Sequence, residues 1–462
     1  MSNIRLTLKD FFNLPTAVIY NPDGFISVTS VTIDSRNVRK NSVFIAIKGE
    51  NFDGHLFVDK AIISGSKVVV INERNYKKHN NVNATIITVK DTTKALGDLA
   101  NIWRKKINTK IIGITGSSGK TTTKEMLAQI LKEKYKVNKT KTNYNNHIGV
   151  PLTILNTSSK NNFLVLELGT NHFGEIEYTS KIAEPDYALI TNIGNSHLQY
   201  FKNKTGVLKE KLSLFRITDE NDGLVFINND DSLLNNSAKK FSNKITYGFS
   251  KGSEIKASDF GNTNDGREIV KIKKGNMNYT ITLPFYGKHN TNNFLSAAAV
   301  ALKLGITKSQ LEKGIGKYKP ADKRFNIKKI KNSILINDTY NANPDSTSIA
   351  IKTMKDFGKN KNKILVFGDM LELGKNSVML HENLSFVIIK EKINEVITIG
   401  KYTKKLHKCL KNTKVISNHF SKNEDLQKYL NQKDFNNSVV LVKGSRGMKM
   451  EQYYKIIEEG LK

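Results

Sequence analysis

The stretch "GITGSSGKTTTKEML", Gly113 to Leu127, constrains the fold of this chain more than any other part of its sequence. The apolar pair Ile111-Ile112 leads into a glycine-rich turn, and a lysine, three threonines and a helix-like run follow. A strand, a turn of this kind and a helix together surround phosphate oxygens with backbone N–H groups and a helix N-terminus. The lysine adds a point charge, and a threonine hydroxyl can reach Mg²⁺. The stretch therefore predicts a phosphate-binding loop rather than a glycine turn whose lysine is merely solvated.

The predicted loop departs in one place from the general pattern G-x-x-x-x-G-K-[ST]. That pattern requires glycine at position 114, where this chain has Ile114. The loop therefore has the shorter form TGxxGKTT, made up of Thr115, Gly116, Ser117, Ser118, Gly119, Lys120, Thr121 and Thr122.

Composition and the ends of the chain limit the class of protein. With 462 residues, and roughly 150 residues per domain, we expect about three domains. No run approaches the roughly 18 apolar residues of a membrane helix, and the start "MSNIRLTLKDFFNLP" lacks the apolar stretch of a signal peptide. One cysteine, Cys409, excludes an intramolecular disulfide. These features predict a cytoplasmic protein without membrane insertion.

The formal net charge of +31 raises the question of a nucleic-acid partner. The lysines are spread along the whole chain, without an arginine-rich tail or a block of five like charges. We therefore expect no nucleic acid, although the charge can attract anionic substrates. A P-loop ATPase coupled to nucleic-acid binding stays a remote alternative, supported only by Glu167 at a strand end.

Strand and helix patterns divide the chain into three parts. Residues 1–108 predict a small mixed α/β domain with short strands in "SVFIAIKG", "KVVVINE" and "ATIITVKD". In 109–318, apolar runs in "KIIGITG", "NFLVLELG" and "DYALITNIG" alternate with helical sequence, and "EIVKIKKGNMNYTITLPF" predicts a hairpin. Residues 319–462 alternate strands and helices again. The predicted fold is α/β with a mixed N-terminal domain, a central P-loop domain on a parallel sheet, and a Rossmann-like C-terminal domain.

Segments along nearly the whole chain resemble the Mur ligase family. The TGxxGKTT loop is similar to that of Mur ligases and folylpolyglutamate synthases. The segments "NYNNHIGVPLTIL" (143–155), "LELGTNHFGEI" (166–176), "TNIGNSHLQYF" (191–201) and "GKHNTNNFLSAAA" resemble family motifs in the same order. "VKGSRGMKME" resembles a C-terminal fingerprint, and "TIDSRNV" and "GENFDGHLF" resemble the nucleotide-sugar-binding first domain. "INDTYNANPDS" and "VFGDMLELG" favour the MurF-type branch over its sister ligases.

The resemblance implies an amide-forming ligase that uses ATP and Mg²⁺ in peptidoglycan precursor synthesis. Its expected small-molecule substrates are UDP-N-acetylmuramoyl-tripeptide and D-Ala-D-Ala, and a monomer is the default expectation. The sequence leaves open whether the third residue of the tripeptide is lysine or diaminopimelate. Another Mur ligase, or a folylpolyglutamate-type ligase, is the alternative.

The resemblance also implies roles for individual residues. Lys120 and Thr121 would hold the β- and γ-phosphates and one Mg²⁺. Glu167 and His197 would be metal ligands, although a lone histidine is more often structural and Mg²⁺ prefers oxygen. Further ATP contacts are expected from Asn290, Asn293, Arg324, Asp338, Tyr340 and Asn341. The two asparagines would also cap a helix start. Because Arg324 belongs to the third domain, the ATP site would be complete only when that domain closes.

Lys211, in "GVLKEKLSLF", aligns with a lysine that is carbamylated in many Mur ligases. Carbamylation would convert this cation into an anion able to bind or orient Mg²⁺, so Lys211 joins Lys120 and His197 as an expected catalytic residue. Family members commonly have glutamate two residues further on, where this chain has Ser213, and Lys209 is a competing assignment.

Candidate substrate-binding residues lie in all three predicted domains. For the UDP-sugar substrate they are Ser35, Arg36, Asp53, Gly54, His55, Asn145 and Asn146. An ordinary capped turn is the alternative interpretation for the first five. Gly444, Ser445 and Arg446 either serve the incoming dipeptide or only shape a turn. His381, Cys409 and Trp103 are expected to be structural.

Overall fold

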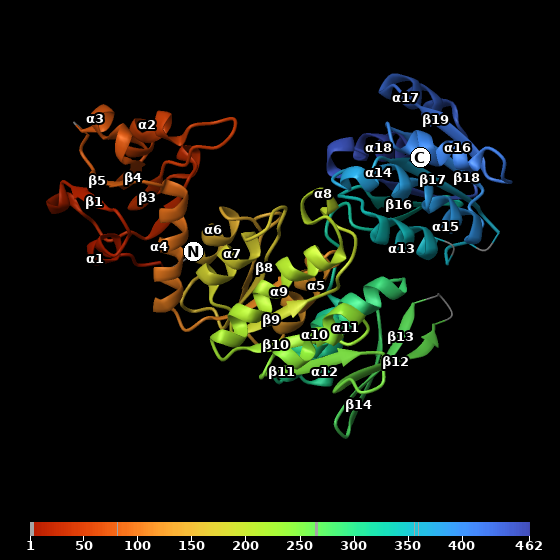
Figure 1. Ribbon diagram of the computed structural model, residues 1–462, viewed down its shortest axis with the longest axis horizontal. Coiled ribbons are helices and arrows are strands. Elements are labelled where there is room, and N and C mark those ends of the chain that lie inside the picture. The colour runs from red at the N-terminus through yellow and green to blue at the C-terminus, as the bar shows by residue number, and fades with distance from the viewer. Residues whose placement is uncertain (1–3, 81, 264–266, 355, 359) are drawn as a thin grey trace.

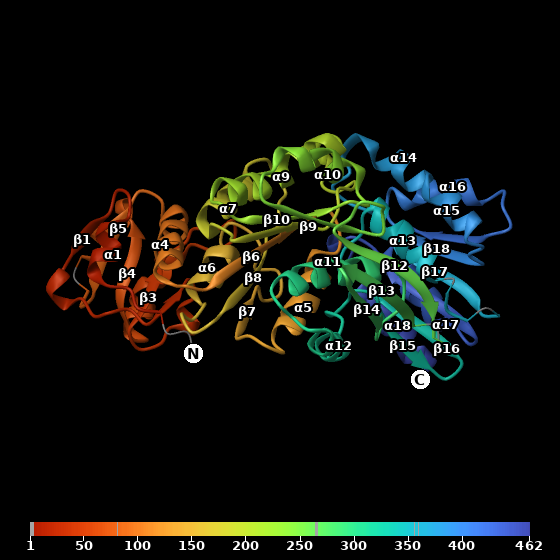
Figure 2. The ribbon, with the colours of Figure 1, turned by 90° about the horizontal axis from the view of Figure 1, so that it is seen from below.

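The computed structural model describes residues 4–80, 82–263, 267–354, 356–358 and 360–462. The described chain forms three sheets, which define a first, a central and a third unit. Their strands lie within the predicted ranges 1–108, 109–318 and 319–462, respectively. Figures 1 and 2 show the central unit between the other two. None of the helices in the described residues has the length and apolar character that crossing a membrane requires.

The first unit is built on a five-stranded sheet with the order β1-β5-β4-β3-β2. The strands β2 to β5 run parallel, and β1 pairs with β5 in the antiparallel direction. The strands are β1 (Val18–Tyr20), β2 (Ser30–Thr32), β3 (Ser42–Ile45), β4 (Ser66–Asn72) and β5 (Thr85–Val89). The helices are α1 (Leu8–Phe12), α2 (Val58–Ile63) and α3 (Tyr76–His79).

The helix α4 (Thr92–Lys106) leads out of the first unit and is packed on the central one. The Asp91 carboxylate caps its start by accepting hydrogen bonds from the backbone of Thr93 and Lys94. Near its end, the Trp103 indole donates to Thr157 O over 3.0 Å, and Arg104 pairs with Asp186 at 2.8 Å. The predicted structural role of Trp103 agrees with this contact, which ties the first unit to the central one.

The central unit has a nine-stranded sheet with the order β14-β13-β12-β11-β10-β9-β6-β8-β7. The pairs from β7 to β12 are parallel, while β12, β13 and β14 pair in the antiparallel direction, so the predicted hairpin is present. The strands are β6 (Lys110–Thr115), β7 (Val137–Lys139), β8 (Phe163–Glu167), β9 (Tyr187–Ile190), β10 (Leu224–Asn228), β11 (Lys244–Gly248), β12 (Ile255–Asn262), β13 (Glu268–Lys274) and β14 (Met277–Thr282).

Helices cover both faces of this sheet because successive side chains of its strands point to opposite faces. Ile112 and Val165 pack toward α5 and α11, whereas Ile111 and Leu164 pack toward α4, α6, α7 and α9. The helices of the unit are α5 (Lys120–Leu131), α6 (Gly149–Leu155), α7 (Glu175–Ala183), α8 (Leu198–Phe201), α9 (Lys204–Glu220), α10 (Ser232–Ser237), α11 (Lys288–Lys303) and α12 (Lys308–Gly316).

The third unit has a six-stranded sheet with the order β15-β16-β20-β17-β18-β19, parallel except for β15. Two apolar clusters cover its two faces. The strands are β15 (Asn326–Ile330), β16 (Ser333–Asp338), β17 (Asn362–Gly368), β18 (Glu395–Ile399), β19 (Ile416–Phe420) and β20 (Ser438–Lys443). The helices are α13 (Pro344–Met354), α14 (Ser377–Glu382), α15 (Leu384–Lys390), α16 (Thr403–Leu410), α17 (Asn423–Gln432) and α18 (Glu451–Leu461).

The arrangement of β6 in the sheet determines where a site can form. From β6 the chain reaches β7 and β8 on one side, and it then crosses back to β9 on the other. A crevice opens at the carboxyl ends of strands where the connections diverge in this way, and ligands bind there. The loops that follow β6, β8 and β9 are the segments that carry the predicted phosphate and metal residues.

Candidate active site

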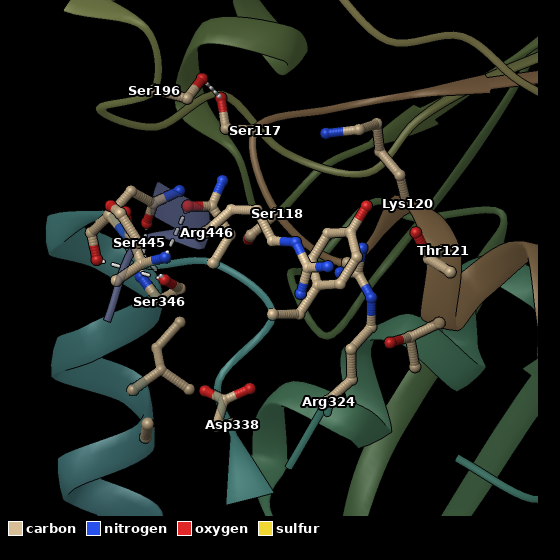
Figure 3. Close-up of a pocket in the computed structure, with 18 of the residues that line it drawn as sticks. Ser117, Ser118, Lys120, Thr121, Ser196, Arg324, Asp338, Ser346, Ser445 and Arg446 are labelled. Atoms are coloured by element: carbon tan, nitrogen blue, oxygen red, sulfur yellow. Dashed lines mark hydrogen bonds between the residues drawn. The ribbon is translucent and has the colours of Figure 1, made fainter. Parts of the chain in front are cut away.

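A cavity of ≈ 410 Å³ lies between the central and the third unit. Most of the predicted ATP and metal residues line it: Ser117, Ser118, Gly119, Lys120, Thr121, Thr122, Glu167, His197, Asn290, Asn293, Arg324, Asp338, Tyr340 and Asn341. The candidate substrate-binding residues Asn145, Ser445 and Arg446 line it as well. In Figure 3, Lys120 and Ser117 lie on one side of this cavity, and Arg324 and Asp338 lie on the other. Thr115, Gly116, Asn146, Lys211 and Gly444 are outside the lining.

The phosphate-binding loop owes its shape to two glycines. Gly119 has a φ of 80° and immediately precedes α5, so the first turn of that helix has no side-chain cap. A Cβ on Gly119 would overlap the Asn293 side-chain oxygen, and one on Gly116 would overlap the Thr191 hydroxyl. The Lys120 ammonium donates to Gly116 O over 2.7 Å. The loop thus presents a lysine and an uncapped helix N-terminus to the cavity, which is the arrangement that binds phosphate.

The segment after β9 holds the loop from behind. Thr191 Oγ1 donates to Ser118 O over 2.6 Å, and the Asn192 carboxamide both accepts from Ser118 N and donates to Ser118 O. These contacts fix the loop without using the N–H groups of the first turn of α5. Sequence reasoning did not single out Thr191 or Asn192, although both belong to the segment "TNIGNSHLQYF".

Glu167 is the last residue of β8, and its carboxylate is buried beside the loop. Its Oε1 accepts from Thr121 Oγ1 at 3.1 Å and from Asn145 Nδ2 at 3.0 Å. Burial raises the pKa of the Glu167 carboxyl, but Lys124, Arg324 and Lys120 lower it by more, so the pKa lies below its ordinary value. The group is therefore a carboxylate at neutral pH.

Lys124 is a residue of the site that the sequence analysis missed. Its side chain is 0 % exposed, and its ammonium donates to Thr140 O at 2.9 Å. It lies 3.4 Å from Glu167 Oε2 and 3.2 Å from Glu125 Oε1. The signal was present, because Lys124 follows Lys120 by one helical turn in "GKTTTK" and so points from the same face of α5.

The third unit contributes a cation and an acid from loops near β15 and β16. The Arg324 guanidinium lies 3.9 Å from the centre of the Tyr340 ring. Asp338 ends β16, and its Oδ2 is 2.5 Å from the buried Lys443 ammonium, which also donates to Asn341 O. Because Arg324 lowers the pKa of Glu167, its charge acts across the cavity on the central unit.

The predicted capping role of Asn290 and Asn293 is wrong. The residue before α11 is Gly287, without a side-chain cap, and Asn290 lies inside the first turn, where its carboxamide donates to Tyr286 O. Asn293 is one turn further on and packs against Gly119. A cap must accept from an N–H group of the first turn, which neither asparagine does. Both still line the cavity.

His197 lies in the loop that follows β9, and Lys211 lies further along the chain in α9. His197 has a φ of 51°, and its Nδ1 is 2.6 Å from Glu372 Oε2 in the third unit. Lys211 is 2 % exposed, whereas the competing Lys209 is exposed. Burial, with a smaller effect of Lys120, lowers the pKa of Lys211 well below its ordinary value. The structure therefore distinguishes the two lysines in a way that the helical pattern could not.

The predicted residues of the first unit form capped turns. The Asp34 carboxylate pairs with Arg36 at 2.8 Å, and the Arg36 side chain is 81 % exposed. The Asp53 carboxylate caps the short 3₁₀ helix η3 (Gly54–Phe57) and lies 2.7 Å from His55 Nδ1. His55 Nε2 accepts from Asn72 N, so both ring nitrogens already have partners. None of Ser35, Arg36, Asp53, Gly54 and His55 lines the cavity described above.

The segment after β20 contacts two neighbouring loops. Ser445 Oγ accepts from Leu371 N at 2.8 Å and donates to Ala342 O. Arg446 lies 3.3 Å from Glu451 and is mostly exposed. His381 is fully buried, accepts from Met370 N and donates to Ser377 O, in agreement with a structural role. Cys409 is an exposed free thiol.

The three units, the loop after β6 and the cavity shared with the third unit define a nucleotide-dependent ligase of the Mur type, and the chain belongs to the Mur ligase family. The family model "Mur ligase middle domain" matches residues 114–301, "Mur ligase, glutamate ligase domain" matches 323–446, and "Mur ligase family, catalytic domain" matches 27–104.

Relatives of 30% identity or more that match nearly the full length of this chain include members of one branch of that family. The UDP-N-acetylmuramoyl-tripeptide–D-alanyl-D-alanine ligase of Buchnera aphidicola subsp. Baizongia pistaciae is 39% identical over 92% of this chain and 91% of its own length. A crystal structure of MurF from Acinetobacter baumannii superposes with a TM-score of 0.88 at 29% identity, over 99% of this chain and 100% of that chain. MurF from Thermotoga maritima in complex with ADP gives a TM-score of 0.82 at 29% identity, over 94% and 97%.

Proposed function

We propose that this chain joins D-alanyl-D-alanine to UDP-N-acetylmuramoyl-tripeptide with the use of ATP. The products are the UDP-N-acetylmuramoyl-pentapeptide, ADP and phosphate, and the step belongs to peptidoglycan precursor synthesis. The observation that carries the proposal is the cavity in which Lys120 and Glu167 of the central unit face Arg324 and Asp338 of the third. The names of the full-length relatives support this choice of substrates.

Amide formation from a carboxylate requires a leaving group, which ATP supplies. The tripeptide carboxylate attacks the γ-phosphorus, the bond to the β-phosphate oxygen breaks, and ADP leaves an acyl phosphate behind. The amine of D-Ala-D-Ala then attacks the acyl carbon and loses a proton as phosphate departs. Negative charge develops on phosphate oxygens in both steps, so fixed cations lower both barriers. Lys120, the first turn of α5 and Arg324 are the groups that can hold that charge.

The donor set beside the loop fits Mg²⁺ together with nucleotide phosphates. Within the described residues, no three His, Cys, Asp or Glu side chains form a metal-binding cluster by themselves. Glu167 Oε2, however, is buried without a hydrogen bond, its nearest charged partner is the Lys124 ammonium at 3.4 Å, and its carboxylate lies next to the Thr121 hydroxyl. These are hard oxygen donors. Thr121 and Glu167 would therefore hold the ion, with His197 as the further ligand that the family resemblance implies, and the bound ion would neutralise charge on the transferring phosphate.

The burial of Lys211 favours the neutral amine that carbamylation requires. An amine reacts with CO₂ only when it is neutral, and burial lowers the pKa of Lys211 well below its ordinary value. The exposed Lys209 has no such environment. A carbamate on Lys211 would place an anion on α9, at a position on which the charge of Lys120 acts.

The roles of the remaining residues follow the same division between units. The first unit, with Ser35, Arg36, Asp53, Gly54 and His55, would take the UDP-sugar, and Asn145 and Asn146 would lie toward the tripeptide. The third unit would bring the dipeptide near Ser445 and Arg446, and its docking would exclude water from the acyl phosphate. A monomer in the cytoplasm is the proposed form of the enzyme.

Two other functions can be separated from this one by substrate. Another Mur ligase or a folylpolyglutamate-type enzyme would use a single amino acid as the amine. A nucleic-acid-coupled ATPase would release phosphate in response to DNA or RNA.

The test is phosphate release from ATP by the purified protein with Mg²⁺. UDP-N-acetylmuramoyl-tripeptide and D-Ala-D-Ala are added separately and then together, and the nucleotide product is identified by mass spectrometry. We expect release only with both substrates, together with the UDP-pentapeptide. Lys120→Ala should show neither. Release with a single amino acid, or with nucleic acid alone, would contradict the proposal.

A further inference from the structure

The loop of residues 192–199, here called the connector loop, contacts the phosphate-binding loop on its inner side. Ser117 N donates to Asn192 O over 3.0 Å, and Gly194 N donates to Ser117 Oγ over 2.8 Å. Ser196 Oγ donates to Ser117 Oγ over 3.1 Å, as Figure 3 shows. Ser117 is therefore bound to three residues of the connector loop, and any shift of that loop moves the phosphate-binding loop with it.

The outer side of the connector loop contacts the third unit through two acidic residues. Asp345, in the first turn of α13, accepts from Asn195 N at 2.5 Å through its Oδ2. Glu372 accepts from Gln199 N at 3.0 Å through its backbone oxygen, and its carboxylate lies beside His197. In Figure 1, α8 at the end of this loop lies next to the third unit. The connector loop is thus held from both sides.

Asp345 differs from Glu372 because it does not line the cavity. Its contact toward the site is with the backbone of the connector loop at Asn195, so we expect its effect on the site to pass through that backbone. The approach is close: a Cβ on Gly194 would overlap Asp345 Oδ2. The φ of Gly194 is not among the positive values, so space rather than backbone conformation requires a glycine at this position.

We propose that Asp345 is a positioning residue whose carboxylate couples docking of the third unit to the shape of the phosphate-binding loop. A hydrogen bond between a carboxylate and a backbone N–H is stronger than one between neutral groups. This one joins two units, so it exists only when the third unit is docked, and it shifts the equilibrium toward the docked arrangement. The connector loop carries the coupling from Asn195 through Gly194 to Ser117. The effect of this coupling on catalysis rests on the proposed function, whereas the effect on docking of the third unit can be tested without it.

The first experiment measures docking in the full-length protein by small-angle X-ray scattering over a range of ADP concentrations with Mg²⁺. The variants are Asp345→Ala, Asp345→Asn and the matched control Asp434→Ala. Asp434 is an exposed acid of the third unit that, among the residues the structure describes, accepts a local bond from Asn436 N and no other. Loss of a hydrogen bond to a charged group changes an equilibrium by roughly 10- to 100-fold.

We expect Asp345→Ala to need roughly 10- to 100-fold more ADP to reach the compact form, because fewer molecules are docked. Asp345→Asn should recover part of this loss, since its amide oxygen still accepts from Asn195 N. The control should match the wild type. In ligation assays, the KM for ATP should rise by a similar factor in Asp345→Ala and by less in Asp345→Asn. A radius of gyration equal to that of the wild type at every ADP concentration would overturn the proposal.

A second experiment tests the route through Gly194. Gly194→Ala should reproduce the docking defect, because its methyl group would occupy the place of the Asp345 carboxylate. In the background of Asp345→Ala that conflict is gone, and the nearest remaining neighbour is Ser117 Cβ at 3.4 Å, an ordinary contact. The second substitution should then change the ADP requirement less than about twofold. If the two substitutions raise the ADP requirement independently, so that their effects multiply in the double variant, the coupling through Gly194 is refuted. A docking defect in a protein without ligase activity would refute the proposed function alone.

Discussion

Replacing Glu167 by glutamine removes one charge from the centre of the site while keeping its shape. The glutamine oxygen can still accept from Thr121 and Asn145, which hold Oε1 at 3.1 and 3.0 Å. The ion pair with Lys124, 3.4 Å away and 0 % exposed, is lost. The variant therefore measures the buried charge rather than the packing.

The magnitude follows from what remains around Lys124. Removing one partner of a buried ion pair costs about 3–5 kcal/mol when the other charge is left without compensation. Lys124 keeps Thr140 O at 2.9 Å and Glu125 Oε1 at 3.2 Å, so we expect a smaller loss of roughly 1–3 kcal/mol in the free energy of unfolding.

The loss should depend on pH in a defined direction. The ordinary pKa of a glutamate is 4.5, and that of Glu167 in the folded protein lies below it. Its carboxylate therefore stabilises the fold above about pH 4.5, and this contribution disappears as the pH falls through the folded-state pKa. The difference between wild type and Glu167→Gln should be complete at neutral pH and should shrink in acid.

The assay combines urea unfolding at neutral and acid pH with phosphate release in the presence of both substrates. Glu125→Gln is the matched control, because it removes the other anion beside Lys124 without touching the cavity. We expect both variants to lose stability, but only Glu167→Gln to lose more than about 100-fold in activity. Loss of an outer partner of a metal ligand already costs about 10- to 100-fold, and Glu167 is proposed to be a ligand itself. Full activity of Glu167→Gln, or a stability loss that persists in acid, would refute the reasoning.

Three further predictions concern residues in the cavity lining and behind it. Lys211→Ala should lose ligase activity and regain part of it with short carboxylic acids, and wild-type activity without them would exclude a carbamate at this position. Gly119→Ala should raise the ADP dissociation constant at least about tenfold in calorimetry, because a residue with φ of 80° costs about 1–2 kcal/mol without glycine and the methyl group displaces Asn293. Burial lowers the pKa of His289 to about 4, so the folded protein must stay neutral at this residue where the unfolded chain takes up a proton. The free energy of unfolding of the wild type should therefore fall by up to about 3 kcal/mol as the pH drops from 6.5 toward 4. Thermal unfolding of His289→Gln should not show this decline.

Much of the central unit could be predicted from local sequence. The apolar runs that became β6, β8 and β9, the hairpin of β13 and β14, and α11 all carry their pattern within fewer than about twenty residues. Periodicity is a local property, and so the elements were predictable. The capping role of Asn290 failed for the same reason: the start of α11 depends on Gly287 and its neighbours, and a cluster of asparagines does not determine which residue is the cap.

The burial and the partners of individual side chains could not be predicted from the local sequence pattern. A helix with Lys209 and Lys211 looks amphipathic in sequence, but only the packing of α9 on the sheet shows that Lys211 is buried and Lys209 is not. Lys124 was missed because its partners, Thr140 and Glu167, lie 16 and 43 positions further along the chain.

The sequence by itself determined the phosphate-binding loop, because a strand, two glycines, a lysine and a helix within 15 residues leave little choice of local structure. Only the tertiary structure decided what faces that loop. Arg324 and Asp338 belong to the third unit, as does Asp345, which contacts the connector loop, and their approach depends on how two units dock. Docking is set by long-range shape and charge, which no short segment encodes. The chain thus specifies where phosphate binds locally, and the packing of the units specifies what can act on it.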